Sequence, residues 1–198
     1  MNAQGSAPEK TPPLPQQNTG TPPERSLPGP VRLVLIAAMS RNRVLARDGK
    51  IPWHQPRDVA FFRARTAGHW LLLGRTTYEQ LTDWLQPDQV PVVLTRQTNH
   101  WSAETGHTVG SVEEAVALAA AEGISELTVC GGGQVYEAIL PSADEVLLTT
   151  VETDVDGDAW FPVLPPDEWV STNEEFFPAD AENPHPMTLT TWQRVRGR

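Results

Sequence analysis

Residues 51–62 read IPWHQPRDVAFF and place a single carboxylate, Asp58, at the start of an apolar run. Proline suits a first helical turn, so a helix is expected from Pro56 to about Thr66. Asp58 and Phe62 are four residues apart and share one face of that helix. One reason for an acid there is the positive end of the helix dipole. A second reason is that the carboxylate binds a ligand that packs beside the Phe62 ring.

A second candidate site is the glycine turn in VCGGGQVYEAIL, residues 129–140. Three glycines let the backbone approach a ligand closely, and a following helix presents its positive end to an anion. The spacing differs from the G-x-G-x-x-G dinucleotide fingerprint, because the three glycines are consecutive and Tyr136 stands three positions later. The turn therefore indicates either a phosphate site or a simple tight turn.

Arginines follow two other apolar segments. LLLGRTTYE, residues 71–79, ends a predicted strand in glycine and opens a short helix with Arg75, and VVLTRQ carries Arg96. Ligands bind open α/β sheets at the carboxyl ends of neighbouring strands. Forked arginine donors there favour an extra phosphate, as in a phosphorylated dinucleotide. Each arginine taken alone is better explained as a solvated side chain, and only their joint placement after strand ends favours the phosphate.

The elements that must position these residues alternate between strand and helix. Apolar runs predict strands at 31–40, 69–74, 90–95, 126–130, 145–151, 168–177 and 187–195. Helices are expected at 56–66, at 75–81, at 111–123 and after the glycine turn, and 41–55 reads as a long loop of the functional kind. For 111–123, Ser111 and Glu114 form a capping box and Gly123 a stop. The order indicates an α/β sandwich with a mostly parallel sheet and an antiparallel edge.

The composition of the chain narrows the classes of function that it can have. The chain has 198 residues, a net charge of −10 and a pI near 4.9, which argues against a nucleic-acid partner. One cysteine excludes an internal disulfide, and neither a membrane span nor a signal peptide is evident. A soluble cytoplasmic protein is expected. Residues 1–30 are rich in proline and polar residues and predict a disordered tail, with TPPLP as an alternative polyproline ligand.

Four segments, taken in order, resemble the dihydrofolate reductase family. They are LIAAMSRNRVLARDGKIPWHQPRDVAFFRART, LLLGRTTYE, VCGGGQVYEAIL and TTVETDVDGDAWFP. The likeness covers residues 31–198, and PWHQPRD is its most specific part. It implies one three-layer α/β domain with an eight-stranded mixed, mostly parallel sheet and about four helices. It also implies NADPH as hydride donor, 7,8-dihydrofolate as acceptor and a monomer.

The resemblance assigns roles to residues. Asp58 is the acid that anchors the pterin and favours protonation of N5 while C6 takes the hydride. Trp53 holds an ordered water near it, and Ile51 lies on the mobile loop (about 41–55) that closes over the nicotinamide. The implied pterin pocket comprises Ile36, Ala38, Val59, Phe62, Arg63, Leu81, Leu85, Cys130, Tyr136 and Thr149, with Thr149 hydrogen-bonded to Asp58. Cys130 is read as a small apolar residue without a nucleophilic role.

The implied cofactor residues come from three regions. The glycine turn should meet the diphosphate and the nicotinamide side, with a cis peptide between its first two glycines. The two arginine segments should hold the adenosine half and its 2′-phosphate, and the mobile loop covers the site. The full set is Ala38, Val44, Leu45, Ala46, Gly49, Lys50, Ile51, Gly74, Arg75, Thr76, Thr77, Leu94, Thr95, Arg96, Gly131, Gly132, Gly133, Gln134, Val135 and Tyr136.

Two further patterns were weighed for metal binding. DVDGD at 154–158 resembles a calcium loop, but its glycine stands fourth and no suitable glutamate follows. In the family this acidic loop contacts the mobile loop through the residue matching Asp158, which is the favoured interpretation. The five histidines show no metal-ligand spacing.

The sequence departs from the family where the substrate's glutamate tail binds. The usual arginine before the third strand is absent from LTDWLQPDQVPVVLT, which carries Asp83 and Asp88 instead. Arg63 or Arg65 is expected to reach the tail in its place. Gly110 and Gln134 stand where the family has basic residues, which weakens the preference for NADPH over NADH. Three hypotheses stay open: dihydrofolate reductase, a same-fold NADPH reductase of another heterocycle as in riboflavin synthesis, and a non-catalytic cofactor-binding module.

Overall fold

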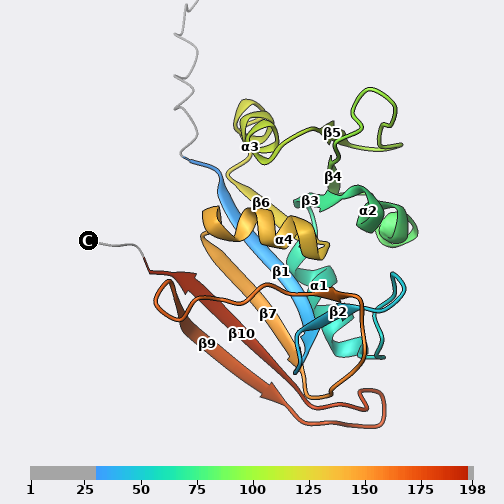
Figure 1. The fold of residues 1–198 in the computed structure, drawn as a ribbon, viewed down its shortest axis with the longest axis vertical. Coiled ribbons are helices and arrows are strands. Elements are labelled where there is room, and N and C mark those ends of the chain that lie inside the picture. The colour runs from blue at the N-terminus through green and yellow to red at the C-terminus, as the bar shows by residue number, and fades with distance from the viewer. Residues whose placement is uncertain (1–29, 196–198) are drawn as a thin grey trace, which may run out of the picture.

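The computed structural model describes residues 30–195. The predicted tail, except Pro30, and the last three residues of the predicted domain lie outside this range. An eight-stranded sheet has the order β5-β4-β3-β6-β1-β7-β10-β9 (Figure 1). Its strands are β1 (Arg32–Ser40), β3 (Trp70–Gly74), β4 (Val90–Leu94), β5 (His107–Val109), β6 (Glu126–Gly131), β7 (Glu145–Val151), β9 (Trp169–Phe177) and β10 (Met187–Arg194).

The helices are α1 (Pro56–Thr66), α2 (Arg75–Leu81), α3 (Val112–Ala121) and α4 (Gly133–Ile139). Two 3-10 turns, η1 (Thr82–Trp84) and η2 (Leu140–Ser142), extend α2 and α4. A separate two-stranded ribbon pairs β2 (Val44–Ala46) with β8 (Ala159–Trp160). The predicted α/β class, the mixed sheet and the four helices are confirmed.

Strand β1 lies inside the sheet and is parallel to both of its neighbours, β6 and β7. Its residues 33–37 are all buried, because a parallel strand in this position is covered on both faces. β10 then pairs antiparallel with β7 and with β9. The long hairpin β9–β10 is the antiparallel edge that the sequence predicts.

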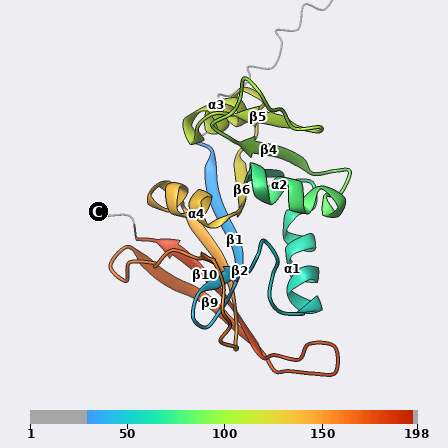
Figure 2. The same ribbon diagram turned by 45° about the vertical axis from the view of Figure 1, so that its right-hand side comes forward.

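Two apolar clusters, one on each face of the sheet, make the three layers. One cluster combines alternate residues of β1, such as Leu33 and Leu35, with Ala115 of α3 and Ile139 of α4. The other combines Val34 and Ile36 with Tyr78 of α2, and side chains of α1 pack against it. In Figure 2, α4 lies to the left of β1 and α1 to the right. The acid-bearing helix and the glycine-turn helix are therefore on opposite faces.

Three short strands and one cap differ from the sequence expectations. The loop 41–55 contains β2, and β5 and β8 were also missed, since two or three residues carry no periodic pattern. The Ser111 hydroxyl caps α3 by accepting from the Glu114 N–H at 3.1 Å. The Glu114 carboxylate, however, accepts from the Gly110 N–H at 2.7 Å instead of closing a capping box on Ser111.

Candidate active site

The candidate site lies at the carboxyl ends of β1, β3 and β6, which are parallel and adjacent. From β1 the chain continues, through the loop 41–55, to α1 on one face of the sheet. From β6 it continues through the glycine turn to α4 on the other face. Neighbouring strands whose connections leave toward opposite faces mark the position where open α/β sheets bind ligands.

Asp58 occupies the first turn of α1 and is half-buried. Burial raises the pKa of its carboxyl above the usual value, because removal from water disfavours the charged form. A hydrogen bond with the Thr149 side chain opposes that rise. Thr149 is a buried residue of β7, so the contact expected from the resemblance is present. The Asp58 carboxylate has a side-chain partner, Thr149, and its oxygens can accept further hydrogen bonds from a ligand.

Tyr136 of α4 brings a phenol to the same region from the other face. Its hydroxyl donates to the Ile36 carbonyl of β1 at 2.6 Å, and the side chain is buried. Burial first, and then repulsion from Cys130 and Asp58 in their ionised forms, raises the pKa of Tyr136 well above its ordinary value. The phenol therefore stays protonated and acts as a neutral donor.

Cys130 is buried at the end of β6, and its thiol donates to the Thr128 carbonyl at 3.6 Å. Burial raises the pKa of the thiol to about 12. Because the thiolate is the reactive form, this cysteine is inert at neutral pH. This geometry fits the apolar role assigned to it.

The apolar wall of the site is made by α1 and η1. Phe62 and Leu85 pack against the cluster of Ile36 and Cys130, while Val59, Leu81, Ala38 and Trp53 are half-buried. Ile51, on the same loop as Trp53, is 59% exposed. It lies with Trp53 and Lys50 along an open pocket formed by residues 47, 48 and 50–54.

Polar contacts tie the loop 41–55 to the acidic loop 154–158. The Arg41 guanidinium pairs with Asp154 at 2.7 Å, and the Asn42 amide donates to the Val155 carbonyl at 2.8 Å. The Asp158 carboxylate accepts from the Asp48 backbone N–H at 2.9 Å, which is the contact expected of Asp158. Arg41, Asn42 and Asp154 were missed, because polar partners more than a hundred residues apart leave no local pattern.

The two turns that follow β3 and β6 pack together closely. A Cβ at Gly132 would lie 3.1 Å from the Thr77 hydroxyl, and one at Gly74 would lie 3.0 Å from Val135. Gly131 has φ +111°, and its peptide bond to Gly132 is cis, as the resemblance implies. The remaining residues of this group differ in exposure: Thr77 and Gly133 are half-buried, Val135 is buried, and Thr76 and Gln134 are exposed.

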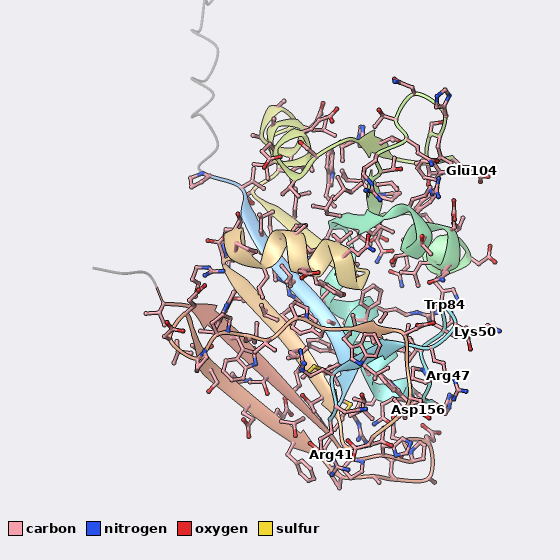
Figure 3. The ribbon with its side chains drawn as sticks, in the orientation of Figure 1. Arg41, Arg47, Lys50, Trp84, Glu104 and Asp156 are labelled. Carbon is pink, nitrogen blue, oxygen red and sulfur yellow. The ribbon has the colours of Figure 1, made fainter. Side chains whose placement is uncertain are left out.

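The two arginines assigned to the 2′-phosphate have different surroundings. The Arg75 guanidinium donates to the Gln97 amide oxygen at 2.5 Å and lies 3.7 Å from the Glu79 carboxylate. Arg96 is exposed, after half-buried Leu94 and buried Thr95. Both arginines thus follow the carboxyl ends of neighbouring strands. In Figure 3, the mobile-loop residues Arg47 and Lys50 point outward along one side of the molecule.

Within residues 30–195, no group of three or more histidine, cysteine or acidic side chains is placed to hold a metal ion. In the same range, none of the helices combines the length and the apolar character needed to cross a membrane. The described site therefore consists of one acid, two strand-to-helix turns and a tethered loop.

Fold and site together bring an acid-bearing helix and a glycine-rich turn to the same edge of an α/β sheet. The family model for dihydrofolate reductase matches residues 32–194. Dihydrofolate reductase of Haemophilus influenzae is 36% identical over 149 residues, 75% of this chain and 90% of the relative. Dihydrofolate reductase HdrB of Haloferax volcanii is 40% identical over 152 residues, 73% of this chain and 78% of the relative. The chain belongs to the dihydrofolate reductase family.

A solved structure gives the same result. Dihydrofolate reductase from Enterococcus faecalis, complexed with NADP(H) and RAB-propyl, matches with a TM-score of 0.77 at 28% identity. The match covers 83% of this chain and 97% of the other. The predicted family and fold are confirmed.

The state of Cys130 gives a first prediction. Because burial holds its pKa at about 12, iodoacetamide should leave the folded protein unlabelled at pH 8 and label one thiol per chain after unfolding in guanidinium. Mass spectrometry of both samples measures the label. Fast labelling of the folded protein would show that the thiol is exposed and ionised, contrary to the structure.

Proposed function

We propose that this chain reduces 7,8-dihydrofolate to 5,6,7,8-tetrahydrofolate with NADPH, and that Asp58 anchors the pterin during the reaction. The observation that carries the residue assignment is the acid itself. Asp58 is half-buried in the first turn of α1, and Thr149 is a hydrogen-bond partner. A buried carboxylate with a raised pKa has few structural explanations. Binding of a ligand that carries adjacent hydrogen-bond donors explains it.

Asp58 accepts hydrogen bonds from the adjacent ring N–H and amino group of the pterin, which fixes the ring's orientation. Its negative charge favours positive charge on the bound ring and so assists protonation at N5. Thr149 holds the carboxylate in place. Tyr136 keeps the Ile36 carbonyl hydrogen-bonded at the pocket wall, and Phe62 contributes an apolar surface on the helix face of Asp58.

NADPH, when bound, supplies the hydride that is delivered to C6 of the substrate. The two packed turns fit such a cofactor. Gly131, Gly132 and Gly74 present backbone without side chains, and a Cβ at Gly132 or Gly74 would crowd its neighbour at 3.0–3.1 Å. Arg75 and Arg96 are proposed to bind the 2′-phosphate through forked donors. The loop 41–55, tethered by Asp158, is proposed to cover the nicotinamide and exclude water.

The glutamate tail has one available cation on α1. Arg65 is engaged elsewhere: its guanidinium pairs with Glu126 at 2.7 Å at the amino end of β6. Arg63 is exposed, five residues after Asp58, and its guanidinium carbon lies 5.5 Å from the centre of the Trp84 ring. Trp84, on η1, is 52% exposed and points outward in Figure 3. Arg63 is therefore proposed to bind the tail carboxylate in preference to Arg65, whose guanidinium already pairs with Glu126.

A single copy of the chain is proposed as the working unit, as the family resemblance implies. We also propose that this unit acts in the cytoplasm, where dihydrofolate and NADPH meet. The same-fold reductase of another heterocycle is disfavoured, because the acid in PWHQPRD belongs to the pterin site of the family.

Replacing the acid tests the central assignment. Asp58→Asn is expected to lower the rate of NADPH oxidation with dihydrofolate at pH 7 by about 100-fold or more, since an acid that assists proton transfer contributes about that much. The control is Asp167→Asn, an exposed acid before β9, which should retain the full rate. Full activity of Asp58→Asn would remove the catalytic assignment.

The same variant should be more stable. Burial raises the folded pKa of Asp58 above 3.8, so the folded state binds protons more readily than the unfolded state, and stability falls as pH rises through this window. Asp58→Asn should therefore raise the free energy of unfolding at pH 7. Below pH 3.8, where the acid is protonated in both states, the difference should vanish. Urea unfolding across this range measures it, and a less stable variant at pH 7 would contradict the burial argument.

The tail assignment is tested with two substrates. Arg63→Gln should raise the Michaelis constant for dihydrofolate by about two- to fivefold, the size expected for one exposed ion pair. It should leave the constant for a dihydropterin without the glutamate tail unchanged. Arg65→Gln, two residues along the same helix, is the control and should change neither value. An unchanged Michaelis constant for dihydrofolate in Arg63→Gln would exclude Arg63.

The cofactor assignment is tested by comparing NADPH with NADH. Arg75→Ala should reduce the ratio of kcat/KM for NADPH to that for NADH by about tenfold or more, because a charge-assisted hydrogen bond to phosphate is lost. Arg32→Ala, at the amino end of β1, is the control and should keep the ratio. If Arg75→Ala keeps it too, the 2′-phosphate is held elsewhere.

A further inference from the structure

The amino end of α1, where Asp58 lies, receives its cap from a distant part of the chain. Gln55 is the N-cap residue, yet its side chain makes no capping hydrogen bond. The Arg57 N–H instead donates to the Asn183 amide oxygen at 2.8 Å, 126 residues away. An unsatisfied N–H in the first turn of a helix needs such a partner. Asn183 is buried and lies in the loop 178–186 between β9 and β10.

Asp180 holds this loop in shape. One of its carboxylate oxygens accepts from the Glu182 N–H at 2.9 Å, from the Asn183 N–H at 2.8 Å and from the Asn183 amide at 2.9 Å. The other accepts from the Arg57 guanidinium at 2.5 Å. These bonds, the Asn183 side chain first among them, lower the pKa of Asp180 to about 2. The acid is therefore charged at any working pH.

Further contacts attach the same loop to both sides of the helix start. The Gln55 amide donates to the His185 carbonyl at 2.9 Å. The Arg57 guanidinium also donates to the Pro178 carbonyl at 3.3 Å and lies over the Phe177 ring, 5.2 Å from its centre. Figures 1 and 2 both show the β9–β10 loop beside the amino end of α1. We call Gln55, Arg57, Asp180 and Asn183 the loop clamp.

We infer that the loop clamp positions Asp58 for catalysis, so that Asp180 and Asn183 are positioning residues of this reductase. Asp58 directly follows Arg57, whose backbone N–H is held by Asn183 and whose guanidinium is held by Asp180. These contacts constrain the first helical turn, from which the Asp58 side chain projects. The clamp also pairs the Arg57 charge with Asp180, which keeps that charge from the neighbouring carboxylate. Misplacing a catalytic group by about 1 Å costs up to about 100-fold in rate. The inference rests on the proposed role of Asp58.

If the loop clamp only stabilises the fold, its loss lowers stability without changing the pH profile of the reaction. If it positions Asp58, its loss changes that profile. The test is therefore the pH profile of hydride transfer in a single turnover, with NADPH and dihydrofolate bound. Tyr136 of α4, whose pKa is raised in part by Asp58, and Cys130 of β6 are both kept neutral by burial. A change in the profile consequently reports on Asp58 itself.

Asn183→Ala and Asp180→Asn should each slow hydride transfer at pH 7 by about three- to tenfold, within the range that misplacement allows. Each should also move the apparent pKa of the step downward, because a loosened helix end lets water reach the carboxylate and relieves the burial that raises its pKa. The control is Glu168→Gln. It removes the Glu168–Arg194 pair of 2.6 Å at the opposite end of the same hairpin and should leave rate and profile unchanged.

The inference fails if both clamp variants lose thermal stability but keep the wild-type rate and profile, or if Glu168→Gln shifts them equally. If Asn183→Ala does not fold, Asp180→Asn decides, because Asp180 is a partly exposed side chain. Asp58→Asn is measured in parallel to separate the two proposals. Full activity of that variant overturns the proposed role of Asp58, whereas its inactivity together with unchanged clamp variants overturns only the positioning role.

Discussion

The burial of β1 on both faces is the constraint on which the rest of the structure depends. A strand that reads RLVLIAAMS with parallel partners on both sides must be covered from above and below. That requirement sends α1 to one face and α4 to the other. Because β1 and β6 end side by side, the acid of α1 and the glycine turn before α4 arrive at one edge of the sheet. The site is a consequence of covering the strand.

Burying an acid is unfavourable for folding. In this structure hydrogen-bonding groups lie around the acid, Asp58, and around the start of its helix. Asp58 has the Thr149 side chain as a partner, and Tyr136 is kept neutral nearby by its own burial. Two loops far apart in sequence then flank the helix start: the loop 41–55 precedes it, and the β9–β10 loop caps it. Under the proposed role of Asp58, stability and activity are opposed at this residue, because a neutral side chain suits the core better whereas anchoring the pterin uses the charge.

The sequence was informative where a pattern is local. The start of α1 at Pro56 follows from proline chemistry, and the long apolar runs gave the central strands with errors of one residue. The family resemblance supplied the contacts of Asp58 with Thr149 and of Asp158 with the mobile loop. Short strands such as β5 escaped, because three residues show no periodicity. The contacts of the β9–β10 loop were not predicted for another reason. Asn183 and Arg57 belong to no sequence motif, and only the folded chain brings them together.

The tether between Asp48 and Asp158 is asymmetric. Asp158 contributes its carboxylate, whereas Asp48 contributes only a backbone N–H. Any residue at position 48 that tolerates φ near +50° offers the same donor, which restricts the position to small polar residues and glycine by shape alone. At position 158 the acceptor is a side-chain carboxylate, so the residue type itself matters there. At this tether, selection should therefore act on the side chain at position 158 and only on the backbone shape at position 48.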